Sequence, residues 1–201
     1  MYRPPCDSII FDLDGTLWDA SPTSVIAWSK TANDLGIDIS IDEAAIKKVS
    51  GLPFDKCVDV LFDSHAEKVQ DLRTLLDESE KNEILQRGGR FYERMSEGIR
   101  QLSREYKLFL VSNCQEWYLN AFFEHSGLRD AFQDTLCFGQ TSRPKSENIK
   151  EIANRNSLKR PIYIGDTHWD QEAAFTAGAK FIFARFGFGS IQVSLMRRGE
   201  M

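Results

Sequence analysis

Short apolar runs bounded by polar or small residues recur along the chain and predict the strands of a buried sheet. There are five such runs, over residues 8–11, 108–111, 135–138, 162–164 and 181–184. Continuously apolar runs of this length are typical of strands buried on both faces, as in a parallel sheet. Helical patterns separate the later runs, over residues 117–126, 146–154 and 171–177. The alternation predicts an α/β fold: a Rossmann-like, doubly wound parallel sheet of five or six strands.

Residues 21–95 do not follow this alternation and contain no comparable strand pattern. They predict helices over residues 21–35, 41–49 and 53–62, and a long polar-rich helix from about residue 66. Glycine-containing turns separate these segments, for example at residues 50–53. We therefore predict a helical cap domain over residues 21–95, inserted after the first strand. The α/β core domain would consist of residues 1–20 and 96–201.

Composition and charge narrow the choice of partners. The net charge of −5 argues against a nucleic-acid partner, because phosphate backbones require a basic face. Any phosphate recognition must therefore come from a local arrangement of cations and backbone N–H groups. No apolar stretch reaches the length of a membrane span, and the four cysteines form no metal-binding or disulfide pattern. We expect a cytoplasmic protein with reduced thiols, no membrane partner and, by default, a monomeric state.

Polar side chains follow four of the predicted strands at the point where each strand ends. They are Asp12 and Asp14, Ser112 and Asn113, Lys145, and Asp166 and Asp170. Because ligands of open α/β sheets bind at the carboxyl ends of the strands, we expect these side chains to converge on one edge.

Carboxylates at such an edge repel one another and raise each other's pKa unless a cation lies among them. Oxygen ligands select a hard ion, and Mg²⁺ is typically held by one or two carboxylates together with substrate phosphate. Asp12 and Asp14 are two residues apart, so in an extended chain they point the same way. One of them can attack phosphorus while the other exchanges a proton. Lys145 and Ser112 can stabilise charge on the phosphoryl oxygens.

These segments resemble the four motifs of the haloacid dehalogenase-like phosphohydrolase superfamily, in the same order and at similar spacing. The matching segments are Asp12-Leu13-Asp14-Gly15-Thr16, Ser112-Asn113, Lys145 and Gly165-Asp166-Thr167-His168-Trp169-Asp170. The helical insertion resembles the small cap of the phosphoglycolate-phosphatase-like subfamily. The segment Gly187-Phe188-Gly189-Ser190 is similar to the end of that subfamily's core domain.

The resemblance implies roles for individual residues. Asp12 would be the nucleophile and Asp14 the general acid/base. Ser112 and the backbone of Asn113 would bind phosphate, and Lys145 would steady both the nucleophile and the phosphate.

The resemblance also implies a metal site. Mg²⁺ would be held by the Asp12 carboxylate, the Asp14 backbone carbonyl and Asp166. Asp170 would support it from nearby, and Thr16 would be a supporting residue in the turn that follows the first strand.

Trp18 and Asp19 lie just beyond the first motif and are the best-placed candidates in the sequence for substrate contacts. His168 lies inside the fourth motif, and we interpret it as a residue at the rim of the site, because the carboxylates already supply proton transfer. Charged residues on the helical insertion are interpreted as a solvated face.

The sequence therefore predicts a Mg²⁺-dependent phosphatase that acts on a small phosphorylated metabolite through an aspartyl-phosphate on Asp12. The alternative is a phosphomutase of the β-phosphoglucomutase type, which would use the same core residues. A dehalogenase is disfavoured because it needs no proton relay at Asp14. A signalling receiver domain is disfavoured by the order of the motifs. The sequence does not identify the natural substrate.

Overall fold

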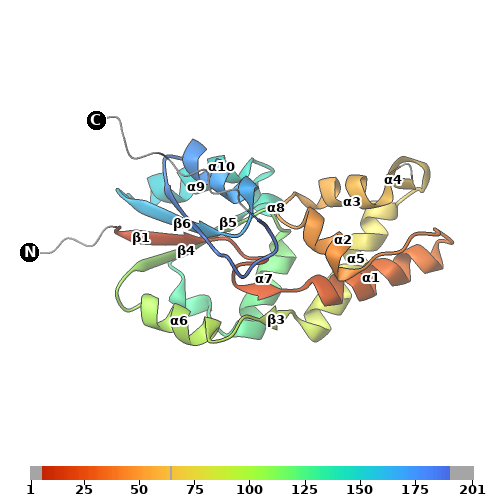
Figure 1. Cartoon of the computed structure of the whole chain (residues 1–201), viewed down its shortest axis with the longest axis horizontal. Coiled ribbons are helices and arrows are strands. Elements are labelled where there is room, and N and C mark those ends of the chain that lie inside the picture. The colour runs from red at the N-terminus through yellow and green to blue at the C-terminus, as the bar shows by residue number, and fades with distance from the viewer. Residues whose placement is uncertain (1–5, 64, 191–201) are drawn as a thin grey trace, which may run out of the picture.

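The chain, described by a computed structural model over residues 6–63 and 65–190, contains a five-stranded parallel sheet (Figure 1). The strands are β1 (Ser8–Phe11), β4 (Lys107–Ser112), β5 (Asp134–Cys137), β6 (Pro161–Gly165) and β7 (Lys180–Phe183). Their order in the sheet is β5-β4-β1-β6-β7, with β1 paired in parallel to both β4 and β6. The predicted α/β fold with a doubly wound parallel sheet is confirmed.

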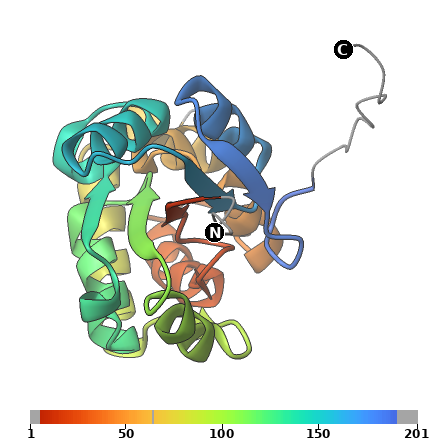
Figure 2. The ribbon, with the colours of Figure 1, turned by 90° about the vertical axis from the view of Figure 1, so that its left-hand side faces the viewer.

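Helices cover both faces of this sheet (Figures 1 and 2). One face carries α6 (Met95–Leu102), α7 (Glu116–Ser126) and the short 3₁₀ helix η1 (Arg129–Ala131), and the other carries α9 (Lys145–Arg155) and α10 (His168–Thr176). The short α8 (Phe138–Thr141) follows β5. Successive residues of a strand point to opposite faces, so Ile9 and Phe11 pack in one apolar cluster with Phe122, and Ile10 packs in another with Ile149. This two-sided burial explains the continuously apolar strands.

The helical insertion has an apolar core of its own. It consists of α1 (Ser21–Asp34), α2 (Glu43–Val49), α3 (Phe54–Phe62), α4 (His65–Lys68) and α5 (Leu72–Arg87). Trp28, Phe62 and Leu76 are buried together in a cluster separate from those of the sheet. Figure 1 shows these helices beyond one end of the sheet. None of the described helices combines the length and the apolar character needed to cross a membrane.

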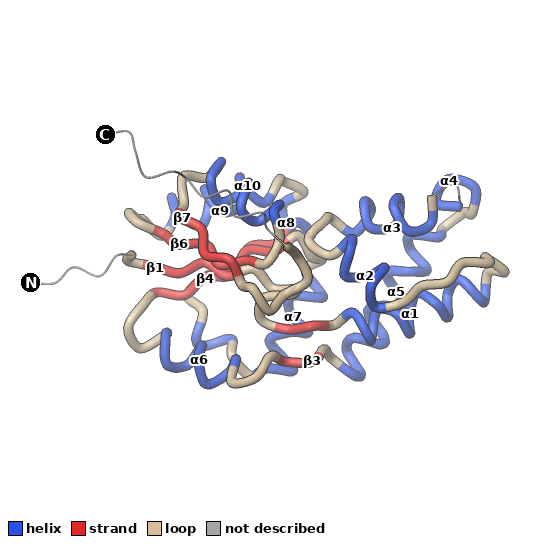
Figure 3. The backbone as a smooth tube through the Cα atoms, in the orientation of Figure 1, coloured by secondary structure: helices blue, strands red, loops and turns tan. Residues whose placement is uncertain are grey.

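Two expectations for this region were wrong. The long helix predicted from about residue 66 is two helices, because Asp71 adopts a left-handed backbone conformation (φ 59°) between α4 and α5. The insertion also contributes a strand: β3 (Arg90–Phe91) pairs antiparallel with β2 (Trp18–Asp19). Each strand has only two residues, which is too short for an apolar pattern to reveal. This pair lies where the chain enters and leaves the helical insertion (Figure 3). The division of the chain into a cap domain, residues 21–95, and a core domain, residues 1–20 and 96–201, stays a prediction.

Candidate active site

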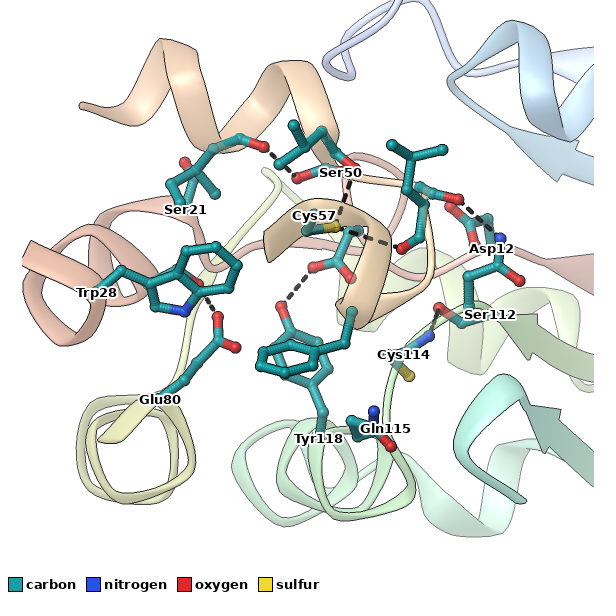
Figure 4. Close-up of a pocket in the computed structure, with 18 of the residues that line it drawn as sticks. Asp12, Ser21, Trp28, Ser50, Cys57, Glu80, Ser112, Cys114, Gln115 and Tyr118 are labelled. Atoms are coloured by element: carbon teal, nitrogen blue, oxygen red, sulfur yellow. Dashed lines mark hydrogen bonds between the residues drawn. The ribbon is translucent and has the colours of Figure 1, made fainter. Parts of the chain in front are cut away.

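The carboxyl ends of β1 and β4 border a cavity of about 90 Å³ between the sheet and the helical insertion. Asp12 and Asp14 line it from the end of β1, and Ser112 and Asn113 line it from the end of β4. Figure 4 shows Asp12 and Ser112 side by side on one wall. The structure therefore brings together the two acids, Asp12 and Asp14, and the polar residues Ser112 and Asn113, as the sequence predicts.

The turn after β1 explains why both acids face the cavity. Leu13, between them, is fully buried in the apolar cluster on the opposite side, and its carbonyl accepts a hydrogen bond from the Leu17 N–H at 2.8 Å. Gly15 has φ 76°, and a Cβ there would lie 2.2 Å from Asp166 Oδ2. Only glycine fits this turn, because it tolerates the left-handed conformation and leaves room for the carboxylate.

Lys145 bridges the candidate nucleophile, Asp12, and a second acid, Asp170. Its Nζ donates hydrogen bonds to Asp12 Oδ1 at 2.8 Å and to Asp170 Oδ1 at 2.6 Å, and all three side chains are buried. Burial alone would lower the pKa of Lys145, but the charges of Asp12 and Asp170 raise it overall. Lys145 is therefore a fixed positive charge that orients the Asp12 carboxylate.

Asp170 is itself held by the first turn of α10. Its Oδ2 accepts hydrogen bonds from the Thr167 N–H at 3.0 Å and the Thr167 hydroxyl at 2.6 Å. The Asp170 N–H in turn donates to the Thr167 hydroxyl oxygen at 3.2 Å, which completes a capping box. Burial raises the pKa of Asp170, but Lys145 and Thr167 outweigh burial and lower it. With both oxygens engaged, Asp170 serves to position Lys145.

Asp166, after β6, is fully buried and anchors two other segments. Its Oδ2 accepts a hydrogen bond from the Phe188 N–H at 2.7 Å, and its Oδ1 accepts one from the Thr16 hydroxyl at 3.3 Å. A Cβ on Gly187 would lie 2.2 Å from Asp166 Cβ, so the segment after β7 closes tightly against this acid. These contacts explain the glycine-rich segment at residues 187–190.

Asp14 has a partner that the sequence did not reveal. The Tyr118 hydroxyl, on α7, donates a hydrogen bond to Asp14 Oδ1 at 2.5 Å. Burial raises the pKa of Asp14 to about 7, while the bond from Tyr118 acts in the opposite direction. A carboxyl group that titrates near neutral pH is suited to give and take a proton. In the sequence, Tyr118 is one aromatic residue among several on an amphipathic helix, and nothing there marks it as functional.

The charge balance of the site fits a divalent cation. Asp12, Asp166 and Asp170 each offer a carboxylate oxygen, and these oxygens lie within 4.8 Å of one another. These three buried acids and the partly buried Asp14 lie beside one buried cation, Lys145. Burial and neighbouring carboxylates raise the pKa of Asp12, and burial raises that of Asp166 to about 6. An all-oxygen donor set with excess negative charge is the kind of site that binds a hard divalent ion.

The helical insertion reaches this site through the turn between α2 and α3. The Asn113 amide donates a hydrogen bond to the Gly51 carbonyl at 2.7 Å. The Asn113 Oδ1 atom, which is buried, has no hydrogen-bond partner among the described residues. The Ser112 hydroxyl accepts a hydrogen bond from the Cys114 N–H at 3.3 Å. The 50–53 turn therefore contacts the loop that we expect to bind phosphate.

Trp18 and Asp19 do not line this cavity. Trp18 is fully buried and packs its ring against Phe91, Tyr118 and Phe122. Asp19 accepts a hydrogen bond from the Ser21 hydroxyl at 2.5 Å and forms an ion pair with Lys47 at 3.0 Å. These positions give no support to a role in substrate contact.

His168 is exposed in the first turn of α10. Its ring lies against that of Trp169, with 4.0 Å between the ring centroids. The histidine is thus at the periphery of the acid-lined edge.

Fold and site together define an α/β protein with a cluster of carboxylates at the carboxyl edge of its sheet. The sequence profile described as haloacid dehalogenase-like hydrolase matches residues 9–184, and the chain belongs to that family. A search of curated proteins finds no significant match.

Solved structures with the same fold include three bacterial proteins. A haloacid dehalogenase-like family hydrolase from Streptococcus pneumoniae is 21% identical with a TM-score of 0.79, covering 94% of this chain and 89% of that one. A predicted phosphatase from Clostridium acetobutylicum is 20% identical with a TM-score of 0.76, covering 92% and 87%. A predicted phosphoglycolate phosphatase from Haemophilus somnus is 20% identical with a TM-score of 0.77, covering 94% and 89%. At these identities the likeness establishes the fold.

Proposed function

We propose that the chain is a Mg²⁺-dependent phosphatase that hydrolyses a small phosphate monoester through an aspartyl-phosphate on Asp12. The observation that carries the proposal is the pairing of Asp12 with Lys145 at 2.8 Å, beside Asp14 in the same cavity. A nucleophile oriented by a fixed cation, next to a carboxyl group that titrates near neutrality, is the arrangement that phosphoryl transfer through a carboxylate requires. The phosphatases among the structural neighbours support the same reaction class.

In the first step, the Asp12 carboxylate attacks phosphorus with its Oδ2 atom, because Oδ1 is held by Lys145. A bond forms between this oxygen and phosphorus, and the bond from phosphorus to the ester oxygen breaks. Protonated Asp14 gives its proton to the leaving alcohol. Tyr118 keeps the Asp14 carboxyl group in place during this transfer.

In the second step, water attacks the phosphorus of the aspartyl-phosphate. Asp14, now ionised, accepts a proton from this water, and the bond from phosphorus to Asp12 breaks to release inorganic phosphate. The cycle leaves Asp12 as a carboxylate and Asp14 protonated, so protons and charges balance.

Binding of the phosphoryl group would use the end of β4 and the start of α9. The Ser112 hydroxyl lines the cavity next to Asp12. The Asn113 backbone N–H and Lys145 would complete the set of donors to the phosphoryl oxygens. Electrostatic stabilisation of these oxygens is the main task in phosphoryl transfer.

The residues that would hold Mg²⁺ are Asp12, Asp166 and the backbone carbonyl of Asp14. When bound, the ion would supply positive charge to the phosphoryl oxygens and keep the Asp12 and Asp166 carboxylates ionised. Asp170 would act through Lys145, and Thr16 through its hydrogen bond to Asp166.

Hydrolysis is favoured over the mutase alternative by the charge of the cavity wall. A mutase must hold a substrate with a phosphate at each end, and the second phosphate needs its own donors. Among the described residues that line the cavity there is no Lys, Arg or His. A cavity wall without these cations therefore favours a substrate with one phosphate over a substrate with two.

A panel of phosphorylated metabolites, assayed for phosphate release with Mg²⁺, tests the proposal. We expect release from at least one small monoester. The panel includes a sugar monophosphate primed with its bisphosphate, because isomerisation without phosphate release would establish the mutase alternative. Cytoplasmic location and a monomeric state remain predictions from the sequence.

A further inference from the structure

The cavity extends from Asp12 into the helical insertion, where it ends at a second group of polar side chains. Glu80 of α5 and Ser24 and Trp28 of α1 line this far end. Their exposed fractions are 7%, 4% and 3%. Figure 4 shows Trp28 and Glu80 together on the wall opposite Asp12. A group on a substrate whose phosphate lies at Asp12 would therefore point toward Glu80.

Glu80 is a buried carboxyl group held in a defined orientation. Its Oε1 atom accepts a hydrogen bond from the Ser24 hydroxyl at 2.5 Å. No contact with a positively charged side chain accounts for its burial within the described part of the chain. Burial raises the pKa of Glu80 to about 7, and the hydrogen bond from the Ser24 hydroxyl acts in the opposite direction. A buried acid without a countercharge is costly for a fold, which suggests a functional reason for keeping it.

Two buried polar atoms on the same cavity wall are unsatisfied. The Trp28 indole nitrogen, a donor, and the Asn113 Oδ1 atom, an acceptor, have no hydrogen-bond partner among the described residues. Among the described residues, only one other buried side-chain nitrogen or oxygen lacks a hydrogen-bond partner, the indole nitrogen of Trp18. Unsatisfied buried groups are rare in native structures, and their clustering in one cavity points to a polar ligand that completes them.

The charge of the cavity wall determines which charge the ligand can carry. The titratable groups that line the cavity in the described structure are acids, Asp12, Asp14 and Glu80, together with weakly acidic thiol and phenol groups. A carboxylate at the far end would meet Glu80 with no cation to offset the repulsion. A hydroxyl or ammonium group would instead donate a hydrogen bond to Glu80, and the rings of Trp28 and Phe54 also suit a cation or aliphatic carbon.

We propose that Glu80, Ser24 and Trp28 bind the leaving group of the substrate, and that this group is small, carries no negative charge and ends in a hydrogen-bond donor, hydroxyl or ammonium. This inference rests on the proposed phosphatase activity. The cavity between Asp12 and Glu80 is small, about 90 Å³, which favours a small leaving group. Glu80 determines specificity and takes no part in the bond-making steps.

Three two-carbon phosphate esters that differ only at the far end provide the test: 2-hydroxyethyl phosphate, phosphoethanolamine and phosphoglycolate. We expect kcat/KM for the better of the first two to exceed that for phosphoglycolate by about 10-fold or more, since a site built around a hydrogen-bonding acceptor discriminates strongly. The better of the two identifies hydroxyl or ammonium as the natural donor. Equal or faster hydrolysis of phosphoglycolate would overturn the inference.

Glu80→Gln separates recognition from a structural role. The amide keeps the size and an acceptor oxygen but removes the charge, so the preference over phosphoglycolate should shrink by about 10-fold, mainly through KM. Glu78→Gln, an exposed position on the same helix, is the matched control and should leave the preference unchanged. Trp28→Phe keeps a ring but removes the indole N–H, and it should raise KM for the favoured ester. An equal loss for all three esters in Glu80→Gln would show a structural role and contradict the inference.

Hydrolysis of an aryl phosphate distinguishes failure of this inference from failure of the proposed phosphatase activity. If the enzyme hydrolyses p-nitrophenyl phosphate but neither the hydroxyl nor the ammonium ester, the inference fails and the phosphatase activity stands. If no phosphate ester is hydrolysed at all, the proposed function and the inference fail together.

Discussion

The hydroxyl of Tyr118 donates a hydrogen bond to Oδ1 of Asp14 across 2.5 Å, linking α7 to the turn after β1. Tyr118 is buried, and its ring packs against Trp18, so the hydroxyl has a fixed position. Asp14 has its pKa raised to about 7 by burial, with Tyr118 opposing that rise. The contact therefore sets both the orientation and the acidity of the proposed proton-transfer group.

Tyr118→Phe removes this hydrogen bond and leaves the ring packing intact. We expect kcat for an aryl phosphate to fall by about 10-fold, in line with the loss of one hydrogen bond to a charged group. Tyr106→Phe, on a half-buried tyrosine outside the cavity, is the control and should keep the normal kcat. Unchanged turnover in Tyr118→Phe would mean that Asp14 does not depend on this contact.

Asp14→Asn removes the proposed general acid/base while keeping the side-chain shape. The chemical step should slow by about 10²–10⁴-fold, the usual effect of losing such a group. Single-turnover kinetics with an aryl phosphate measure this step directly. A near-normal rate would assign proton transfer to another residue.

Removal of metal should abolish activity, and Mg²⁺ should restore it after chelation. Three buried acids, Asp12, Asp166 and Asp170, and the partly buried Asp14 face one buried cation, so a bound ion should also stabilise the fold. We expect Mg²⁺ to raise the melting temperature of the protein.

Asp166→Asn should lose most of the stabilisation by Mg²⁺, because it removes one of the proposed ligands. Asp130→Asn, at an exposed position, should retain it. Hydrolysis that persists at full rate without any divalent metal would refute the metal site.

Glu80 should make stability depend on pH. Its pKa is raised from 4.5 to about 7, so the folded state favours the neutral form. Below about pH 4.5 the folded and unfolded states both hold the proton and no penalty arises. As the pH rises to about 7 the penalty grows to about 3 kcal/mol and then levels off, at 1.36 kcal/mol for each pKa unit.

Comparison with Glu80→Gln isolates this effect. The melting temperature of the variant relative to the unmodified protein should increase between pH 4.5 and pH 7 and stay constant above. The same comparison for Glu78→Gln should show no such trend. A difference that does not change with pH would indicate that Glu80 titrates normally.

The fold was predictable because its signals are local. The apolar strands and the helices expected between the later ones appear in the sequence within one to three residues of their positions in the structure. The two-residue strands β2 and β3 were missed because they carry no periodic pattern and form only through pairing across the insertion. The break at Asp71 was missed because an acid in a polar-rich helical segment gives no signal of a left-handed backbone.

The site was predictable only in part. Asp12, Asp14 and Lys145 could be selected because each follows a strand, and parallel strands bring such positions to one edge. Tyr118 and Glu80 lie in helices, where an aromatic or acidic residue usually serves packing or solubility. Their positions depend on how the helical insertion and α7 meet the sheet, and that contact is not encoded in a local motif.

The central claim is that Asp12 is the nucleophile of a phosphatase, and the release of inorganic phosphate by Asp12→Asn tests it most directly. The assay compares this variant with the unmodified protein on an aryl phosphate with Mg²⁺, after circular dichroism has shown that both are folded. The account predicts Mg²⁺-dependent release by the unmodified protein and none above background by Asp12→Asn. Release by the variant at a rate close to that of the unmodified protein would contradict it.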